Sequence, residues 1–366
     1  MSDEALMERA LALAMRGWGR VSPNPMVGAV VVADGRVVGE GAHEGPGLPH
    51  AEVVALREAG ERARGASLFT TLEPCSHHGR TPPCVDAVIA AGIARVVAAT
   101  TDPNPIVDGR GIARLREAGI EVMTGVHAAE AARINAAFAK HIRTGIPFVI
   151  WKTASSLDGK VASRDGTSRW ITGEAARRDV HRLRAWSDAI LVGAGTVVAD
   201  DPSLTVRDPE YVGRPPFRVL ADAAGRVPPS GDLFDDEAPT IVATTERAGR
   251  DRREGWRAVG AEVLVYAPGS DGMVPVGELL GDLGKRDVQG VLLEGGPTLA
   301  WSAVEEGTVD RVVAYLAPAL IGGAEAPSAL GGRGFAPVGR ALRLDLVEAE
   351  TVGGDLRVEA DVHRDR

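Results

Sequence analysis

Cysteine is scarce in this chain. Only two cysteines occur among 366 residues, and both lie in one short stretch, at positions 75 and 84. Two thiols cannot form the disulfide framework of a small secreted domain, and we expect a reducing compartment, the cytoplasm. The N-terminal residues Met1–Ala5 are acidic and lack the basic and apolar regions of a signal peptide. No apolar run approaches the roughly 20 residues that span a bilayer, so we expect no membrane association.

Positive charge is also in short supply. Lysine and arginine total 41 against 50 aspartates and glutamates, which gives a formal net charge of −9. A general nucleic-acid binder needs a basic surface to neutralise phosphates, so we expect no nucleic-acid partner. A single phosphorylated small molecule remains compatible, because one or two local arginines suffice to bind it. The length favours two domains at roughly 150 residues each, and the sequence leaves open whether the chain forms a homo-oligomer.

Three short motifs together predict a metal site. They are His50-Ala51-Glu52, Glu73-Pro74-Cys75 and Pro82-Pro83-Cys84. Catalytic zinc takes three protein ligands and leaves a fourth position open, and His50, Cys75 and Cys84 supply the three. Glu52 lies too near His50 in the chain to be a convenient ligand, but near enough to the open position to move protons. This H-x-E and P-C arrangement is typical of zinc-dependent deaminases.

Two other interpretations of these residues remain open. One is a closed structural zinc site with His77 or His78 as fourth ligand, and the other is a reduced cysteine pair without metal. Neither gives Glu52 a purpose. The eight residues Ser76–Pro83 between the cysteines also depart from the P-C-x-x-C spacing of the nucleic-acid-editing deaminases.

That longer loop carries a resemblance to a known family. The run 71–84, T-L-E-P-C-S-H-H-G-R-T-P-P-C, resembles the deaminase half of the bifunctional riboflavin-biosynthesis deaminase-reductases. The resemblance implies that His77 and Arg80 bind substrate beside the zinc. The run S-P-N-P-M-V-G at 22–28 is similar to the substrate loop of the same family, and it adds Asn24 to the substrate-binding residues.

Apolar periodicity in the first 145 residues predicts alternating helices and strands, with a break at Thr144–Pro147. We therefore expect a cytidine-deaminase-like α/β/α domain over 1–145. Asp34-Gly35 predicts a two-residue hairpin. The expected elements are a helix at 4–17, a strand at 29–32, a helix at 50–64, a strand at 68–72, a helix at 84–91, a strand at 95–100, a helix at 112–118, a strand at 120–123 and a connecting helix at 128–142.

A second alternation over 146–366 favours a mostly parallel sheet covered on both faces. Its expected strands are 148–155, 188–193, 217–221, 239–244, 288–293, 309–316 and one near the C-terminus, and its expected helices are 174–186, one from Thr196, 274–283 and one from Pro297. No G-x-G-x-x-G fingerprint occurs, but two glycine turns, at 193–196 and 294–298, run from an apolar strand into a helix. Such turns can bind a pyrophosphate through backbone N–H groups.

These turns, with the runs 152–160, 168–172 and 200–207, look like the reductase half of the same family. The resemblance implies a dihydrofolate-reductase-like domain that uses NADPH. Its implied cofactor-binding residues are Ala154, Trp170, Thr196, Asp200, Gly296, Pro297, Thr298 and Leu299. Its implied substrate-binding residues are Ser168, Arg184, Leu204, Arg207 and Glu294. Lys152 and Asp200 are expected nearest the carbon that receives hydride, and the sequence does not show which proton either moves.

Less specific interpretations remain for several of these residues. Trp170 could be a core aromatic, the arginines of 177–184 could form a solvated helix face, and Asp200-Asp201-Pro202 could be an ordinary helix-ending turn. At Asp222-Ala223-Ala224 a hydroxyl is missing after the aspartate, which leaves a cofactor contact there in doubt. The residues that would bind the 2′-phosphate of NADPH are not evident.

The resemblance as a whole implies a two-step enzyme of riboflavin biosynthesis. The first domain, with zinc, would hydrolytically deaminate 2,5-diamino-6-(5-phosphoribosylamino)pyrimidin-4(3H)-one, and the second would reduce the ribosyl side chain of the product with NADPH. Two competing functions are an RNA-editing deaminase with a C-terminal binding module and a zinc-stabilised scaffold. The acidic balance and the histidine-bearing loop argue against the first, and Glu52 argues against the second.

Overall fold

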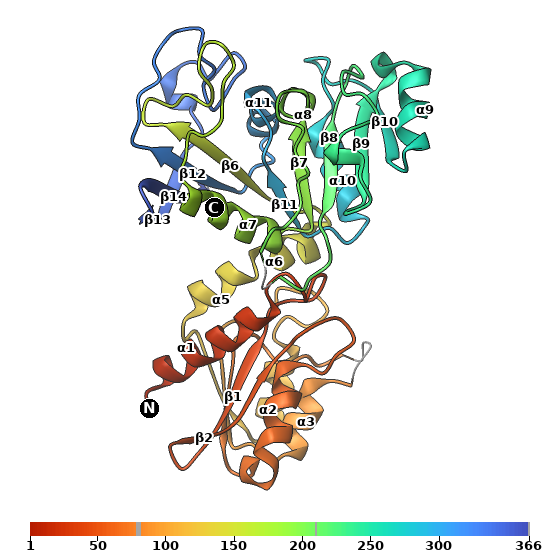
Figure 1. The fold of residues 1–366 in the computed structure, drawn as a ribbon. Coiled ribbons are helices and arrows are strands. Elements are labelled where there is room, and N and C mark those ends of the chain that lie inside the picture. The colour runs from red at the N-terminus through yellow and green to blue at the C-terminus, as the bar shows by residue number, and fades with distance from the viewer. Residues whose placement is uncertain (78–81, 209–210, 365–366) are drawn as a thin grey trace. The chain divides into compact units, whose positions relative to one another are not determined.

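The computed structural model describes residues 1–77, 82–208 and 211–364. The chain divides into two compact units, Met1–Gly145 and Ile146–Arg366, each with its own sheet and core (Figure 1). Within the described residues no helix combines the length and apolar character that a membrane span needs.

The first unit is built on a five-stranded sheet in the order β2-β1-β3-β4-β5. Its strands are β1 (Gly28–Ala33), β2 (Arg36–Ala42), β3 (Ser67–Thr70), β4 (Arg95–Ala98) and β5 (Glu121–Thr124). β1 is antiparallel to both β2 and β3, whereas β3, β4 and β5 are parallel. Asp34 and Gly35 join β1 to β2 with φ angles of 49° and 71°, which confirms the predicted two-residue hairpin.

Helices cover both faces of this sheet, which confirms the α/β/α prediction. The helices are α1 (Asp3–Ala14), α2 (Ala51–Ala59), α3 (Cys84–Ala90), α4 (Arg110–Glu117), α5 (Ala128–Ile134) and α6 (Ala136–Thr144), with 3-10 turns η1 (Met15–Gly17) and η2 (Gly60–Ala63). Apolar residues of α1 pack with Val30 and Phe69 on one face, and those of α2 and α3 pack with Ala29 and Leu68 on the other.

Glycines let two helices lie directly on the strands. A Cβ on Gly28 would lie 2.0 Å from the carbonyl oxygen of Ala10 in α1, and a Cβ on Gly41 would lie 2.1 Å from that of Ala51 in α2. No side chain fits at such distances, so these two positions fix how closely the helices approach the sheet.

The connecting helix predicted over 128–142 is wrong in one respect, because Asn135 divides it into α5 and α6. Asn135 has φ −104° and a buried side chain. Its Oδ1 accepts a hydrogen bond from the Met26 N–H at 2.8 Å, and its Nδ2 donates to the Met26 carbonyl at 2.9 Å. The break between α5 and α6 therefore positions the Asn135 side chain to fix the loop that leads into β1.

The second unit has a nine-stranded sheet in the order β10-β9-β8-β7-β11-β6-β12-β14-β13. Its strands are β6 (Phe148–Ser156), β7 (Ala189–Gly193), β8 (Phe217–Ala221), β9 (Thr240–Thr245), β10 (Glu262–Tyr266), β11 (Gly290–Leu293), β12 (Arg311–Ala317), β13 (Leu344–Val352) and β14 (Asp355–Val362). The neighbouring strands from β10 to β12 all pair in parallel. Only the pairs β12–β14 and β14–β13 are antiparallel, so the predicted mostly parallel sheet is confirmed.

Its helices are α7 (Glu174–Trp186), α8 (Ala194–Asp200), α9 (Arg250–Ala258), α10 (Val276–Gly284) and α11 (Pro297–Glu305), with 3-10 turns η3 (Asp232–Phe234), η4 (Glu246–Ala248) and η5 (Val338–Arg340). Residues of α10 and α11 cover one face of the central strands, and residues of α8 and α9 cover the other. The helix expected from Thr196 begins two residues earlier, and α9 and β10 were not predicted.

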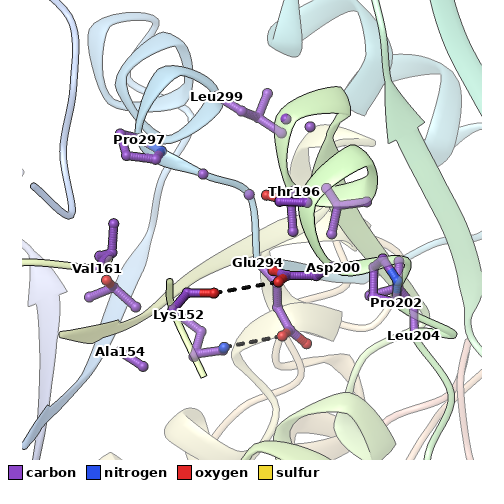
Figure 2. Close-up of a pocket in the computed structure, with 18 of the residues that line it drawn as sticks. Lys152, Ala154, Val161, Thr196, Asp200, Pro202, Leu204, Glu294, Pro297 and Leu299 are labelled. Carbon is purple, nitrogen blue, oxygen red and sulfur yellow. Dashed lines mark hydrogen bonds and ion pairs between the residues drawn. The ribbon is translucent and has the colours of Figure 1, made fainter. Parts of the chain in front are cut away.

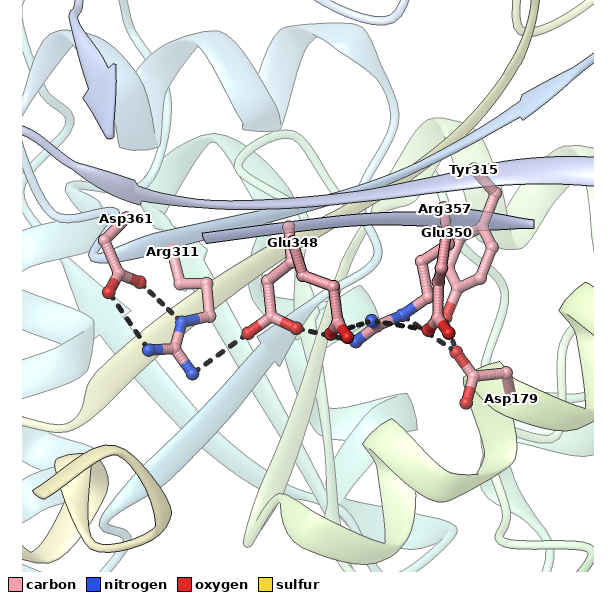
Figure 3. Close-up of polar contacts among 8 residues, drawn as sticks. Asp179, Arg311, Tyr315, Glu348, Glu350, Arg357 and Asp361 are labelled. Atoms are coloured by element: carbon pink, nitrogen blue, oxygen red, sulfur yellow. Dashed lines mark hydrogen bonds and ion pairs between the residues drawn. The ribbon is translucent and has the colours of Figure 1, made fainter. Parts of the chain in front are cut away.

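Ionic contacts tie α7 to the last two strands (Figure 3). Asp179 of α7 accepts a hydrogen bond from the Tyr315 hydroxyl at 2.6 Å and lies 3.1 Å from Nε of Arg357. Arg357 also pairs with Glu359 at 2.7 Å, and Arg311 pairs with Glu359 at 3.1 Å. The side chains of Arg311, Arg357 and Glu359 are nearly buried, so this cluster fixes the antiparallel strands to the rest of the sheet.

Candidate active sites

The three predicted metal ligands meet at one point of the first unit. His50 is the N-cap residue of α2, Cys84 is the first residue of α3, and Cys75 follows β3. One ligand atom from each lies within 4.8 Å of the other two. Nδ1 of His50 lies 3.0 Å from Sγ of Cys84 and 3.5 Å from Sγ of Cys75. The fold therefore assembles the set that the motifs predicted.

These donors suit zinc. Tetrahedral zinc with its usual bond lengths to sulfur and nitrogen holds such atoms about 3.5 Å apart, close to the separations found here. Hydrogen bonds from Cys84, together with nearby His50, lower the pKa of the Cys75 thiol to about 4 against the opposing effect of burial. One thiolate is thus ready for metal, and the start of α3 places partial positive charge beside Cys84.

Glu52 lies beside the ligands, in the first turn of α2, and its side chain is buried. Burial, helped by the negative charge of Cys75, raises the pKa of the Glu52 carboxyl to about 7. A carboxyl with a pKa near neutrality can accept and return a proton, which is the property of a general acid and base.

His43 is a residue of this site that sequence reasoning missed. Its ring packs edge-on against the His50 ring, with centroids 5.3 Å apart. Nδ1 lies 3.2 Å from the Pro49 carbonyl, which can only accept, so Nδ1 carries the hydrogen. Burial lowers the pKa of His43, and its neutral Nε2 accepts from Nδ2 of Asn24 at 2.9 Å. This contact turns the Asn24 carbonyl oxygen away from His43 and links the predicted substrate residue to the ligand His50 through the His43 ring.

Glu73, next to the Cys75 ligand, is also buried. Its carboxylate accepts the backbone N–H groups of Asp102, Gly109 and Ile112 at 2.9 to 3.1 Å. It therefore fixes the loop after β4 against the metal-binding segment.

The predicted residue His77 has a buried Nδ1 without a hydrogen-bond partner in the described chain, as a group awaiting a ligand would. His78 and Arg80 lie outside the described residues.

The second unit contains a cavity of about 1050 Å³. It lies at the carboxyl ends of the central strands β6, β7, β8 and β11, the edge where ligands bind in open α/β sheets. All the residues predicted for the reductase half line this one cavity, although they come from segments spread over 148 residue positions, Lys152 to Leu299.

The buried carboxylate of Glu294 is shared by two cations of the cavity, and Figure 2 shows its contact with one of them, Lys152. Glu294, with a side chain 7% exposed, lies 3.1 Å from Nζ of Lys152 and 2.6 Å from Nε of Arg184. Arg184 also donates to the Thr205 carbonyl at 3.1 Å. Although burial opposes it, these two cations hold the pKa of the Glu294 carboxyl well below its usual range. The default interpretation of Arg184 as part of a solvated helix face is therefore wrong.

Asp200 lies at the end of α8, on the same cavity as Lys152. Its Oδ1 accepts from the Ser168 hydroxyl at 3.4 Å and lies 3.6 Å from Nε of Arg169. Trp170 is 69% exposed, and the guanidinium of Arg177 lies 4.4 Å from its ring centroid. Trp170 is thus not a core aromatic but a surface ring at the cavity.

The two glycine turns face each other across β7 and β11, which are neighbours in the sheet. A Cβ on Gly296 would lie 3.4 Å from the Thr196 hydroxyl, and one on Gly295 would lie 2.7 Å from Leu299. The turns are therefore closely packed, and a cofactor backbone can approach their N–H groups at the starts of α8 and α11.

Two further predicted substrate residues lie in the segment after α8. Leu204 is buried, lines the cavity and has φ +51°, a strained value for leucine. Arg207 is exposed, and its guanidinium donates to the Ser203 hydroxyl at 2.8 Å.

The two sites define a bifunctional enzyme, a zinc-dependent deaminase joined to a reductase. Residues 1–100 match the cytidine and deoxycytidylate deaminase zinc-binding region, and residues 147–358 match the RibD C-terminal domain. The chain belongs to the RibD family of riboflavin biosynthesis proteins, whose reductase domain is NADPH-dependent.

Similarity to individual relatives extends over both units. Riboflavin biosynthesis protein RibD of Escherichia coli strain K12 is 47% identical, over 88% of this chain and 89% of the relative. Two solved structures cover 99% of both chains: Acinetobacter baumannii RibD, at 39% identity and a TM-score of 0.87, and a diaminohydroxyphosphoribosylaminopyrimidine deaminase/5-amino-6-(5-phosphoribosylamino)uracil reductase from Thermotoga maritima, at 37% and 0.86.

Proposed function

We propose that residues 1–145 hydrolytically deaminate 2,5-diamino-6-(5-phosphoribosylamino)pyrimidin-4(3H)-one, and that residues 146–366 reduce the resulting 5-amino-6-(5-phosphoribosylamino)uracil to the ribitylamino product. The observation that carries the proposal is the meeting of His50, Cys75 and Cys84 beside the buried carboxyl of Glu52. The relative from Thermotoga maritima has these two substrates in its name. The two free thiols, both used as ligands, suit a reducing compartment, and we place the enzyme in the cytoplasm.

In the deaminase step Glu52 is the proton carrier. His50, Cys75 and Cys84 would hold zinc, which when bound would supply the Lewis acidity that makes water a nucleophile near neutral pH. Glu52 takes a proton from the attacking water and delivers it to the departing amino group, so that water and the aminopyrimidine become the pyrimidinone and ammonia. Asn24, oriented by His43, would bind the edge of the pyrimidine, and His77 and Arg80 would contact the rest of the substrate.

In the reductase step the cavity holds substrate and cofactor side by side. When bound, NADPH would supply the hydride, and together with one proton this hydride reduces the ribosyl group to the ribityl chain. The glycine turn of Gly296–Leu299, with Ala154, Trp170 and Thr196, would bind the cofactor, and Ser168, Leu204, Arg207, Arg184 and Glu294 would position the substrate. Lys152, which lies 3.1 Å from Glu294, and Asp200 are the polar groups that we place at the reacting carbon.

The test is incubation of the purified protein with the diaminopyrimidine phosphate, with and without NADPH, and identification of the products by mass. We expect the deaminated uracil without NADPH and the ribityl product with it, at the cost of one NADPH per molecule. Ammonia release without any NADPH oxidation would contradict the reductase assignment. A substrate that returns unchanged in both incubations would contradict the deaminase assignment.

A further inference from the structure

One cation of the reductase cavity has no partner among the residues that the structure describes. Arginines line the cavity at five described positions. Four are engaged: Arg169 with Asp200, Arg177 with Thr172, Arg184 with Glu294 and Arg207 with Ser203. The fifth, Arg226, is exposed and forms no hydrogen bond or ion pair with the described residues. An uncommitted guanidinium on a cavity wall is suited to an anionic ligand.

The order of strands places Arg226 at one end of the cavity. Reading β6, β11, β7, β8 across the sheet, Lys152 lies on β6, the glycine turns follow β11 and β7, and Arg226 lies in the loop after β8. With neighbouring strands about 4.8 Å apart, β6 and β8 are separated by roughly 14 Å. A dinucleotide with its nicotinamide at β6 and its pyrophosphate at the glycine turns therefore directs its adenosine half toward the loop of Arg226.

The acidic residue of this loop is turned away from the cavity. In many dinucleotide sites an acidic side chain beyond a strand binds the ribose 2′-hydroxyl, whereas an arginine there accommodates a 2′-phosphate. Asp222 follows β8 directly but is 1% exposed, and its Oδ2 accepts the Val227 N–H at 2.8 Å. Its Oδ1 accepts the Ala224 N–H at 3.3 Å. The carboxylate is thereby occupied within the loop, which removes an acidic group that would repel a phosphate.

The backbone around Arg226 is fixed although its side chain is uncommitted. The Val227 carbonyl accepts from Nε1 of buried Trp256 at 3.1 Å and from Arg252 at 3.3 Å. On the other side, the hydroxyls of Thr244 and Thr245 donate to the carbonyls of Asp222 and Ala223 at 2.6 and 2.7 Å. A fixed loop holds the start of the Arg226 side chain in place, so that little order has to be gained when it binds a ligand.

We propose that Arg226 binds the 2′-phosphate of NADPH and sets the preference of the reductase for NADPH over NADH. The inference rests on the reductase activity proposed for residues 146–366, and it adds the group that distinguishes the two cofactors. A guanidinium can donate paired hydrogen bonds to phosphate oxygens, and NADH carries only a hydroxyl group at the 2′ position.

The test measures binding directly, by titration calorimetry of the full chain with 2′,5′-ADP and with 5′-AMP, which differ only in the 2′-phosphate. The wild type should bind 2′,5′-ADP more tightly. Arg226→Ala should weaken 2′,5′-ADP binding roughly 10- to 100-fold, as expected for a hydrogen bond to a charged group, and should leave 5′-AMP binding within about twofold. Arg226→Lys should keep part of the preference, because it keeps the charge but loses the paired geometry.

Arg250→Ala is the matched control, since Arg250 is an exposed arginine at the start of α9 that pairs with Glu254 and does not line this cavity. It should bind both nucleotides as the wild type does. Equal wild-type binding of the two nucleotides, or an unchanged preference in Arg226→Ala, would overturn the inference. Turnover of NADPH measured on the same wild-type sample tells the two failures apart, because it continues if only the role of Arg226 is wrong and is absent if the reductase assignment is wrong.

Discussion

Glu52 concentrates the deaminase chemistry in a single side chain. It is 3% exposed, sits within one helical turn of His50, and has a pKa raised to about 7 by burial. A buried carboxyl that made only structural hydrogen bonds would have its pKa lowered by them, which is the opposite direction. The environment of Glu52 therefore fits a group that gains and loses a proton during each turnover.

Glu52→Gln should lower the rate of deamination roughly 100- to 10,000-fold, because the amide cannot carry the proton in either direction. Zinc content, measured by elemental analysis, should stay at one ion per chain, since Glu52 is not a ligand in our assignment. Reduction of the uracil intermediate should continue. A variant that loses its zinc would show that Glu52 coordinates the metal.

Cys84→Ser is the companion variant, and the reverse result is expected for it. Its thiolate is one of three ligands, so zinc content should fall and deamination should fall with it. A Cys84→Ser protein that retains zinc at full occupancy would contradict the ligand set.

Arg184 and Arg207 were both predicted to bind substrate, and their surroundings now predict different outcomes for their variants. Arg184→Ala leaves Glu294, whose side chain is 7% exposed, with Lys152 as its one remaining cation. Breaking a buried ion pair in this way costs about 3–5 kcal/mol in the free energy of unfolding. Chemical denaturation should detect this loss, and a variant as stable as the wild type would contradict it.

The same pair has a pH signature. Because the pKa of Glu294 is lowered in the folded chain, its stabilising contribution is present above the ordinary glutamate pKa of about 4.3 and is lost as the pH falls below that value. The difference in unfolding free energy between wild type and Glu294→Gln should therefore shrink below about pH 4. A difference that grows on acidification would contradict the ion pair.

Arg207→Ala should affect binding and not stability, because Arg207 is exposed and its one side-chain bond is to Ser203. We expect the KM for the phosphorylated substrate to rise roughly 10-fold, at the lower end for a hydrogen bond to a charged group, with the KM for NADPH unchanged. A substrate without the phosphate should not distinguish this variant from the wild type. Loss of NADPH affinity instead would assign Arg207 to the cofactor.

Among single residues, the sequence identified those whose chemistry restricts the residue type. Zinc accepts few residue types, so His50, Cys75 and Cys84 could be recognised from their spacing. His43 could not, because a neutral histidine between an asparagine and a ligand belongs to no short motif. The partnership of Arg184 with Glu294 joins residues 110 positions apart, and the packing of α7 against β11 brings them together.

Among the elements, the contact between α2 and β2 is the one on which the metal site depends. Gly41 of β2 lies against Ala51, the residue between His50 and Glu52. Gly41→Ala would place its Cβ 2.1 Å from the Ala51 carbonyl oxygen, so α2 must move. We expect a loss of about 1–3 kcal/mol in unfolding free energy and a weaker hold on zinc. Unchanged stability and zinc affinity would contradict this close contact.

Gly281→Ala is the same substitution at a helical glycine of α10 where a Cβ would meet nothing within 4 Å. It should stabilise the protein by up to about 1 kcal/mol, the difference in helix propensity between the two residues. If Gly41→Ala lowers the unfolding free energy and Gly281→Ala raises it, the effect at Gly41 is steric.

Most elements followed from apolar periodicity, and the exceptions have physical reasons. Helix α9 has the sequence R-D-R-R-E-G-W-R-A and buries only Trp256, so no apolar periodicity predicted it. Asn135 broke a helix because its side chain bonds to the distant Met26, a tertiary contact that no local pattern contains. The antiparallel position of β14 and β13 at the sheet edge was likewise beyond a pattern that specifies strands but not their order.

For the whole molecule, the two compact units predict that the activities can be separated. Expressing 1–145 and 146–366 as two proteins should give a zinc-containing deaminase and an NADPH-dependent reductase, because each has its own sheet and core. Each fragment should be assayed with its own substrate after circular dichroism shows that it is folded. Folded fragments without these activities would contradict the assignment of one activity to each unit.

Glu294 is the first of five consecutive residues, 294–298, that form the second glycine turn. Its carboxylate pairs with Lys152 and Arg184, and the backbone N–H groups of the same five residues are proposed to bind the cofactor. A ligand that orders residues 294–298, whether substrate or cofactor, also orders them for the other ligand. Substrate and NADPH should then bind with positive cooperativity, and because free-energy coupling is reciprocal, each should raise the affinity of the other by the same factor.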